Sequence, residues 1–529
     1  MTRWFFLTRV AMLSVTTAAL AGPPPGLDAR IDGLLKTYGT PALAVTIVEN
    51  GKVTLAKGYG VRRLGKPEKV DPDTLFLTGS TGKAFTVAAL ATLVDAGKLG
   101  WDDKVIDHLP DFQMYDPWVT REMTVRDLLV HHSGLGEGEG DLLFAPSSNL
   151  SRAAAVRRLR YLKPSSSFRS NYAYDNVLYM VVGQLIEAVT GQTWEVYIRE
   201  KVLQRAGMLN STSSDTDRFR DPDRAQPHGR LNGAIRGLGD QEVLDERATL
   251  GANAAPAGGL AISAADMSRW LLIQLAQGQL PEGGRLFSEA AAAQMWTPQT
   301  LMPIAPRPAS LALTAPQFQS YALGWEERDW RGHKIIWHAG LDIGFGAVVV
   351  LIPEKNVGFS ILMNAEDGVP TIGLMDELLD YYLGFPRVDW PTTLNAYRQA
   401  QIAAALAATD KVGAAAAAGV GPSLPVARYS GEYVDPWYGP ITIRLDGAGL
   451  SIDFRQSPGM VGRLEHFQYD TFKTVWKDKQ IEPAYVTFHL GADGTVENIR
   501  MKAVSPLADF SYDYQDLNFT PAPARADSP

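Results

Sequence analysis

Ser80 and Lys83 stand three residues apart in the stretch Thr78 to Phe85 and could form a nucleophile and its base. Residues at this spacing on a helix are neighbours, with about 5–6 Å between their Cβ atoms. A serine hydroxyl becomes a good nucleophile when a base takes its proton, and a lysine can do so only when neutral. Neutralising a lysine at pH 7 costs roughly 4–5 kcal/mol in water, which burial or a helix N-terminus can offset. The spacing therefore suits acyl transfer, although a helix cap beside a solvated lysine is the alternative structural interpretation.

The same stretch has some likeness to a phosphate-binding loop, because it contains Gly-Ser-Thr-Gly-Lys. That loop needs a glycine where Leu77 stands and a serine or threonine where Ala84 stands. The spacing therefore excludes nucleotide binding here.

The segments around this pair predict the elements that position it. Residues 84–94 are apolar on every side, which predicts a buried helix that starts at Ser80 and ends near Gly97. Residues 27–38 predict an amphipathic helix, and residues 41–48 and 52–59 predict a β-hairpin across Asn50-Gly51. Strands are also predicted at 335–340, 346–352 and 357–363, so strands at both ends of the region would share one sheet.

Two further polar motifs lie beside predicted elements. Tyr174-Asp175-Asn176 lies in the loop that enters a helix at 177–189, which Gly191 ends. His338-Ala339-Gly340 lies on a strand. The irregular segment 211–258 is predicted to form a wall of the site, and Ser263 with Asp266 predicts a capping box that opens the next helix.

His131 and His132 raise the question of a metal site. No H-E-x-x-H pattern and no acidic third ligand at a useful spacing accompany them. The pair is interpreted as part of a structural turn.

The composition changes after about residue 385. Residues 386–427 are rich in alanine and then in glycine and proline, which predicts a helix and a linker. Residues 428–520 alternate apolar and polar residues around Asp-Gly turns and predict a separate all-β barrel domain, followed by a tail at 521–529.

Charge and cysteine content exclude several classes of function. The net charge of -8 gives no reason to expect nucleic acid or an anionic membrane as a partner. The chain has no cysteine, so disulfides, thiol catalysis and thiolate metal sites are excluded.

The N-terminal segment has the pattern of a targeting sequence. Residues 1–21 contain two arginines, then a short apolar run, and then a cleavage pattern of small residues, which together predict a signal peptide cleaved after Ala21. We therefore expect a periplasmic or secreted protein without a membrane span.

The three motifs in this order, with Leu128 to Leu135, resemble the serine β-lactamase and penicillin-binding protein superfamily, in particular its class C-like D-aminopeptidase and esterase branch. The resemblance covers residues 28–385. It implies an α+β fold with an antiparallel sheet, flanking helices and an α-rich subdomain over 22–385. The C-terminal domain resembles the lipocalin-like barrel of some members.

The resemblance also implies a role for each motif residue. Ser80 would be acylated, Lys83 would take its proton, and Tyr174 would pass a proton to the leaving group and activate water. Asn176, His338 and Gly340 would contact the substrate, and the backbone N–H groups of Ser80 and Leu341 would form the oxyanion hole. This chemistry needs no metal and no cofactor.

Two departures from the family pattern narrow the expected function. His338 stands where β-lactamases carry the lysine of K-T-G, and it would be fully charged only below a pKa of about 6.5, which argues against strong β-lactamase activity. The Asp175 carboxylate could attract the free amine of a substrate, or it could face solvent. We expect that it faces solvent.

We therefore expect an exported serine hydrolase, a peptidase or amidase of short peptides, with D-amino-acid or cyclic-peptide-derived substrates among the candidates. A carboxylesterase, and a weak β-lactamase or penicillin-binding protein, are the alternatives, as is a non-catalytic peptide-binding protein. The partner would be a small peptide or ester, and the oligomeric state stays open.

Overall fold

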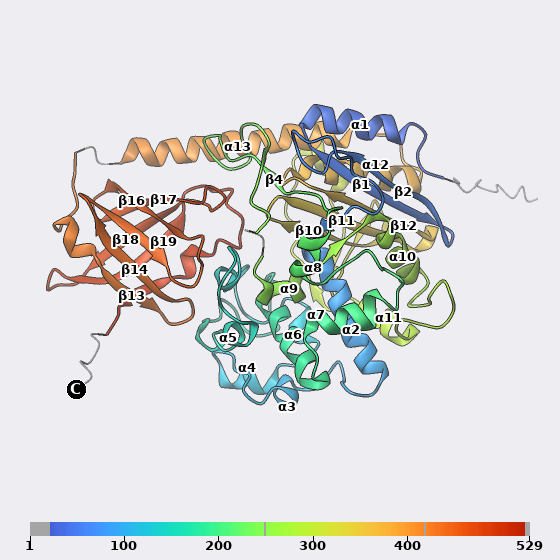
Figure 1. Ribbon diagram of the computed structural model, residues 1–529, viewed down its shortest axis with the longest axis horizontal. Helices are drawn as coiled ribbons and strands as arrows, with labels where there is room; N and C mark the ends of the chain where they lie inside the picture. The colour runs from blue at the N-terminus through green and yellow to red at the C-terminus, as the bar shows by residue number, and fades with distance from the viewer. Residues whose placement is uncertain (1–21, 248–249, 417–418, 524–529) are drawn as a thin grey trace, which may run out of the picture.

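An antiparallel sheet of eight strands carries the predicted site. The computed structural model describes residues 22–247, 250–416 and 419–523, so the predicted signal peptide lies outside the described residues (Figure 1). The strands are ordered β2-β1-β12-β11-β10-β9-β8-β7. Their bounds are β1 Ala42–Glu49, β2 Lys52–Gly60, β7 Thr300–Leu301, β8 Gln319–Tyr321, β9 Glu326–Trp330, β10 His333–Asp342, β11 Phe345–Ile352 and β12 Val357–Met363.

The predicted hairpin is present as β1 and β2. Asn50 and Gly51 connect the strands with φ of 50° and 76°, as the left-handed geometry of such a turn requires. β1 pairs on its other side with β12, for example Leu43 with Met363. The sheet therefore joins the two ends of this domain, as predicted.

Alternate residues of β1 point to two different cores. Ala42 and Ala44 belong to the core that contains Trp270 of α10, whereas Leu43 and Val45 belong to the core on the opposite face. Helices α1 and α12 cover that opposite face. The bounds of these three helices are α1 Leu27–Tyr38, α10 Ala264–Leu275 and α12 Gly368–Leu383. Ser263 caps α10 by accepting a hydrogen bond from the backbone N–H of Asp266, as the capping box predicts.

A helical subdomain packs below the sheet in the view of Figure 1. Its central helices are α2, Lys83–Asp95, and α6, Val177–Thr190, and most residues of each are buried. The prediction that the helix starts at Ser80 was wrong in detail, because Gly79–Gly82 forms a separate 3₁₀ turn, η1, before α2. The remaining helices of the region are α3 Val105–His108, α4 Pro117–Glu122, α5 Arg152–Val156, α7 Trp194–Ile198, α8 Asp215–Arg220, α9 Ala255–Gly258 and α11 Glu289–Met295.

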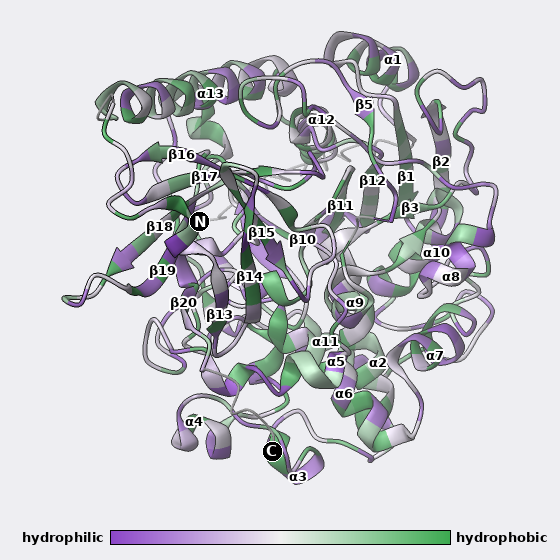
Figure 2. Cartoon of the chain, turned by 60° about the vertical axis from the view of Figure 1, so that its left-hand side comes forward, coloured by the Kyte–Doolittle hydropathy of each residue, from purple (hydrophilic) through white to green (hydrophobic). Residues whose placement is uncertain are grey.

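A long helix, α13, Trp390–Ala415, leads from this domain to a closed β-barrel (Figure 1). Alternate residues of its strands, such as Leu450, Ile452 and Phe454, are buried inside, and hydrophobic residues appear in green along the strands in Figure 2. The predicted α+β fold with a C-terminal all-β barrel is confirmed. The barrel strands are β13 Gly431–Asp435, β14 Gly439–Asp446, β15 Gly449–Phe454, β16 Val461–Gln468, β17 Thr471–Trp476, β18 Ala484–Leu490, β19 Val496–Ala503 and β20 Asn518–Pro521.

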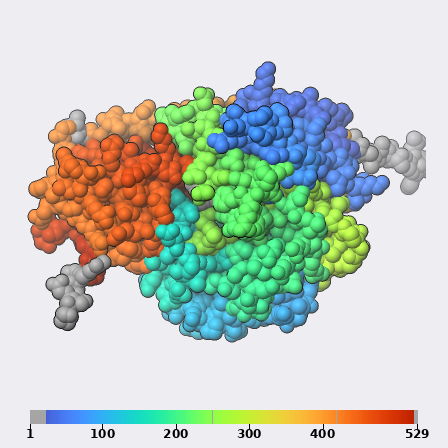
Figure 3. Space-filling view, in the orientation of Figure 1, coloured from blue at the N-terminus to red at the C-terminus, as the bar shows by residue number. Residues whose placement is uncertain are grey.

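The barrel rests directly against the first domain. In Figure 3 its orange surface meets the teal and green segments of the helical subdomain and of the irregular insert. Arg236 of the insert donates a hydrogen bond to the Gln480 carbonyl, and Asp513 accepts hydrogen bonds from the backbone N–H groups of Gly140 and Leu142. Over the part of the chain that the structure describes, no helix is long and apolar enough to cross a membrane.

Candidate active site

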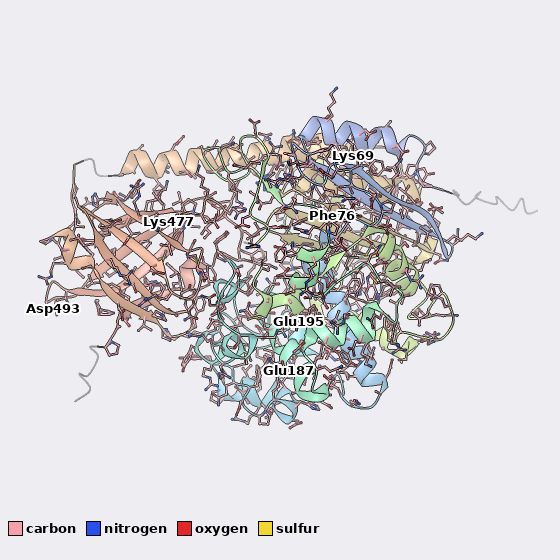
Figure 4. The ribbon with its side chains drawn as sticks, viewed as in Figure 1. Lys69, Phe76, Glu187, Glu195, Lys477 and Asp493 are labelled. Atoms are coloured by element: carbon pink, nitrogen blue, oxygen red, sulfur yellow. The ribbon has the colours of Figure 1, made fainter. Side chains whose placement is uncertain are left out.

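Ser80 and Lys83 meet where η1 passes into α2. Phe76 of β3, Phe76–Leu77, lies buried inside the domain just before this turn (Figure 4). The Lys83 side chain is fully buried, and its Nζ lies 3.0 Å from Ser80 Oγ, 2.7 Å from Asn176 Oδ1 and 2.9 Å from the Ala257 carbonyl oxygen. The amine therefore has three oxygen partners and no contact with solvent.

Burial changes the proton affinity of Lys83. It lowers the pKa of the amine from its ordinary value to about 7, although the negative charges of Asp141 and Asp175 partly oppose this effect. A substantial fraction of the amine is then neutral near pH 7. A neutral amine 3.0 Å from a serine hydroxyl can accept its proton, so this pair can perform nucleophilic chemistry.

Tyr174 lies beside this pair but is not hydrogen-bonded to it. Its ring centroid is 4.7 Å from Lys83 Nζ, and its buried hydroxyl has no hydrogen-bond partner of normal geometry among the described residues. Burial raises the pKa of Tyr174 well above its ordinary value, although the nearby Ser80 side chain opposes this effect. The phenol is therefore neutral at physiological pH and can donate a proton but not act as a phenolate.

Asn176, the residue before α6, is engaged on both sides of its amide. Its Oδ1 accepts from Lys83, and its Nδ2 donates to Asp141 Oδ2 at 2.8 Å. The predicted substrate contact through Asn176 therefore competes with two existing hydrogen bonds. Asp141 was not among the predicted site residues, because nothing in its local sequence distinguishes it from a loop residue.

The backbone around Leu341 lies against the Ser80 turn. A Cβ added at Gly340 would lie 3.1 Å from the Ser80 backbone nitrogen, and one added at Gly79 would lie 2.6 Å from that of Leu341. The two backbone N–H groups predicted for the oxyanion hole are thus on adjoining segments. Such a pair can stabilise the oxygen of a tetrahedral intermediate.

Gly340→Ala is expected to damage both stability and activity. The new Cβ would lie 2.0 Å from the Thr78 carbonyl oxygen, so the strand and the Ser80 turn must separate, at a cost of about 1–3 kcal/mol. Thermal unfolding and ester turnover measure the two effects. The control is Gly33→Ala in α1, where no atom lies within 4 Å of the added Cβ and no loss is expected. Equal behaviour of the two variants would contradict the close packing of β10 on the turn.

His338 is buried, with an exposed fraction of 2%, and both ring nitrogens have partners. Nδ1 lies 2.5 Å from the Ala339 carbonyl oxygen, so this nitrogen carries the proton, and Nε2 accepts from the Tyr321 hydroxyl at 2.8 Å. Burial and the neighbouring Lys83 lower the pKa of His338 to about 3. The expectation that its charge changes near pH 6.5 was wrong, since the ring stays neutral throughout the physiological range.

Asp175 does not face solvent, and that expectation was wrong too. Its side chain is fully buried, with Oδ1 3.0 Å from His131 Nδ1 and Oδ2 accepting from the Ser133 hydroxyl at 2.6 Å. The segment from Leu128 to Leu135 thus holds the loop that carries Tyr174 and Asn176. His132 bonds Asp127 instead, at 2.7 Å, which agrees with a structural role for the histidine pair.

A cavity of about 250 Å³ opens at Leu341 and extends between the two domains. The insert contributes Arg236 and Leu250 to its wall, as predicted for segment 211–258, and the loop between β19 and β20 contributes Leu507, Ser511 and Tyr512. A larger cavity of about 580 Å³ adjoins it near α13 but contains none of the predicted catalytic side chains. Neither cavity is lined by Ser80, Lys83 or Tyr174. The smaller cavity is the better candidate for substrate binding because it reaches Leu341, whose backbone N–H group is predicted for the oxyanion hole.

Sequence comparison finds two family matches in the chain. The Beta-lactamase family matches residues 27–380, and a domain of unknown function matches residues 415–521. The chain is 30% identical over 433 residues to an unguisins hydrolase of Aspergillus campestris, covering 78% of this chain and 76% of that protein. It is 28% identical over 361 residues to penicillin-binding protein 4 of Amycolatopsis lactamdurans, covering 65% and 85% of the two chains.

Two solved structures share the fold at lower identity. The octameric penicillin-binding protein homologue from Pyrococcus abyssi has a TM-score of 0.58 and 19% identity, covering 93% of this chain and 98% of that chain. A class C beta-lactamase from Rhodobacter sphaeroides has a TM-score of 0.52 and 20% identity, covering 67% of this chain and 99% of that chain. The first of these alignments therefore extends over most of the barrel domain as well.

Proposed function

The chain belongs to the beta-lactamase family, and on that basis we propose that it is an exported serine hydrolase that cleaves amide bonds of short peptides through an acyl-enzyme on Ser80. One observation carries the proposal. The buried Lys83 amine, with a pKa of about 7, lies 3.0 Å from the Ser80 hydroxyl. A nucleophile and a base that is matched to neutral pH are the minimum that this chemistry requires.

In the proposed acylation, Ser80 Oγ forms a bond to the substrate carbonyl carbon while its proton moves to Lys83. The carbonyl oxygen becomes an oxyanion held by the backbone N–H groups of Ser80 and Leu341. When the C–N bond breaks, the proton passes from Lys83 through the Tyr174 hydroxyl to the leaving amine. In deacylation, Lys83 and Tyr174 take a proton from a water molecule while the water oxygen forms a bond to the acyl carbon. The bond between that carbon and Ser80 Oγ then breaks, the proton returns to Ser80 Oγ, and the acid is released. The neutral phenol of Tyr174 suits such a relay.

The neutral His338 supports a peptidase over a β-lactamase. β-Lactams present a carboxylate, and in this position the ring supplies no positive charge because its pKa is about 3. We therefore expect acylation by penicillins to be slow. The relative from Aspergillus campestris is named for hydrolysis of unguisins, and this name supports a hydrolytic activity for this chain.

The test of the proposed reaction compares a short-chain nitrophenyl ester with D- and L-amino-acid nitroanilides, using the chain from Gly22 onward. Cleavage of an anilide by the unaltered protein and its loss in Ser80→Ala would establish a peptidase. Ester cleavage without anilide cleavage would favour the carboxylesterase alternative instead. For export, which rests on the sequence of residues 1–21, the test is whether protein recovered from the producing cell's exterior or periplasm begins at Gly22.

The barrel is proposed to restrict substrate length by covering the site. Phe510, on the loop between β19 and β20, packs its ring 5.8 Å from the ring of Tyr174. Phe510→Ala is expected to raise kcat/KM for longer peptides relative to dipeptides by roughly 5-fold, because a bulky group beside the site is removed. Peptides of two to six residues with the same terminal chromophore measure the effect.

The matched control is Tyr469→Ala, which removes an exposed aromatic side chain elsewhere on the barrel. An unchanged length preference in Phe510→Ala, or the same change in both variants, would contradict the covering role.

A further inference from the structure

A chain of hydrogen bonds joins the barrel domain to the proposed base. The Ser511 hydroxyl donates to Asp141 Oδ2 at 2.8 Å, and Asn176 Nδ2 donates to the same oxygen at 2.8 Å. Lys83 Nζ in turn donates to Asn176 Oδ1 at 2.7 Å. Three links therefore connect a residue of the loop between β19 and β20 to the amine beside Ser80.

The chain determines which end of the Asn176 amide faces Lys83. The Asp141 carboxylate oxygen accepts from the NH₂ group, which leaves the amide carbonyl oxygen for the amine. With the amide flipped, its NH₂ group would face an amine that is itself a donor. Asp141 is fully buried and Asn176 is 93% buried, so water cannot easily replace these partners.

Asp141 also acts on the charge of Lys83. Burial lowers the pKa of Lys83, and the negative charge of Asp141 is the largest influence that raises it again. Burial raises the pKa of Asp141 to about 7, while the hydrogen bonds from Asn176 and Ser511 oppose that rise. The Ser511 hydroxyl thus favours the ionised carboxylate, and the carboxylate favours a more strongly basic Lys83.

The barrel loop is anchored beside Ser511. Two residues further on, Asp513 accepts hydrogen bonds from Gly140 N at 2.6 Å and from Leu142 N at 3.0 Å, on either side of Asp141. On the other side of Ser511, Phe510 packs on Tyr174. The loop is therefore fixed at both flanks of Ser511, and the hydroxyl is placed by the docking of the domain.

We propose that Ser511, acting through Asp141 and Asn176, is a positioning residue for Lys83, so that the barrel domain completes the catalytic centre. This inference rests on the proposed function, since it concerns the base of that reaction. It predicts that removal of the Ser511 hydroxyl weakens the base while Ser80 and the two backbone N–H groups of the proposed oxyanion hole stay in place.

Other polar and titratable groups surround the two buried charges. Around Lys83 they are Ser80, His131, Tyr174, Asp175, Asn176, Tyr179 and His338. Around Asp141 they are Lys83, Asn176, Asp509, Ser511 and Asp513. Substitution of Ser511 leaves all the others in place, so a change in pH dependence reports on the chain of hydrogen bonds.

The experiment measures the rate of Ser80 labelling by a fluorophosphonate against pH in the full chain. In Ser511→Ala, Asp141 is less ionised and the pKa of Lys83 falls. The acid limb of the profile is therefore expected to move to lower pH, and the plateau to drop about 3- to 10-fold because the base is weaker. Asp141→Asn should move the limb further in the same direction, by roughly one pH unit. Ser511→Thr keeps the hydroxyl and should restore the profile of the unaltered protein.

The control is Ser505→Ala, in the same loop, where the hydroxyl accepts from Leu507 N within the barrel. It should leave the profile unchanged. A lower rate in Ser511→Ala with an unmoved acid limb would indicate loosened docking alone and would overturn the inference, as would unaltered rates. If the unaltered protein is not labelled at all, the proposed function itself fails, so the two failures are distinguishable.

Discussion

Ser80→Ala is expected to lower turnover of every ester and amide substrate by roughly 10³-fold or more. The oxygen of this hydroxyl is the proposed bond-forming atom. Among the described residues, the Ser80 hydroxyl is the only one hydrogen-bonded to the Lys83 amine. Residual turnover would come from substrate binding and the oxyanion hole alone. The measurement is steady-state hydrolysis of a nitrophenyl ester, with intact-mass detection of the acyl-enzyme in the unaltered protein.

Ser170→Ala is the matched control for this experiment. Ser170 is exposed, lies in the segment leading to Tyr174, and its hydroxyl donates to the nearby Ser167 carbonyl. Its loss should change turnover less than twofold. An Ser80→Ala variant that melts normally and keeps the turnover of the unaltered protein would refute the assignment of the nucleophile.

Lys83→Met is expected to lower the acylation rate by a similar factor, roughly 10³-fold, because an apolar side chain of similar length removes the base and keeps the volume. In the unaltered protein the rate should rise with pH through about 7 and then level off. The rate rises with pH because, below this pKa, the Lys83 amine is protonated and cannot accept the proton of Ser80. The measurement is the pH dependence of fluorophosphonate labelling from pH 5 to 9.

The control is Lys57→Met, which removes an exposed lysine paired with Asp28 at 2.8 Å. It should keep both the rate and the limb near pH 7. A limb that persists at its full amplitude in Lys83→Met would show that another group is the base, and His338 could not be that group because its pKa is about 3.

The inference about Ser511 links these results to the domain arrangement. If it holds, the barrel affects the chemical step and not only the access of substrate. Phe510 and Ser511 are neighbours in one loop with separate expected effects, one on substrate length and the other on pH dependence. The two variants therefore separate the roles of a single loop.

Local sequence was sufficient for those features that depend on nearby residues. The Asn50-Gly51 turn, the Ser263 cap and the uniform burial of α2 each follow from backbone preferences or apolar periodicity within a short window. The Ser80 and Lys83 contact is of the same kind, because three positions on one turn bring the side chains together. The barrel follows from alternation and turns in the same way.

Tertiary structure alone decided the environment of the site. Ser511 and Asp141 are separated by 370 positions in the sequence, so no local pattern relates them. Asp175 is buried because His131 and Ser133 lie opposite it, and His338 is neutral because its strand places it next to Lys83 and away from water. Burial and charge proximity depend on which segments pack together. The sequence by itself therefore determined which groups are proposed to react, and the packing of distant segments determined their proton affinities and orientation.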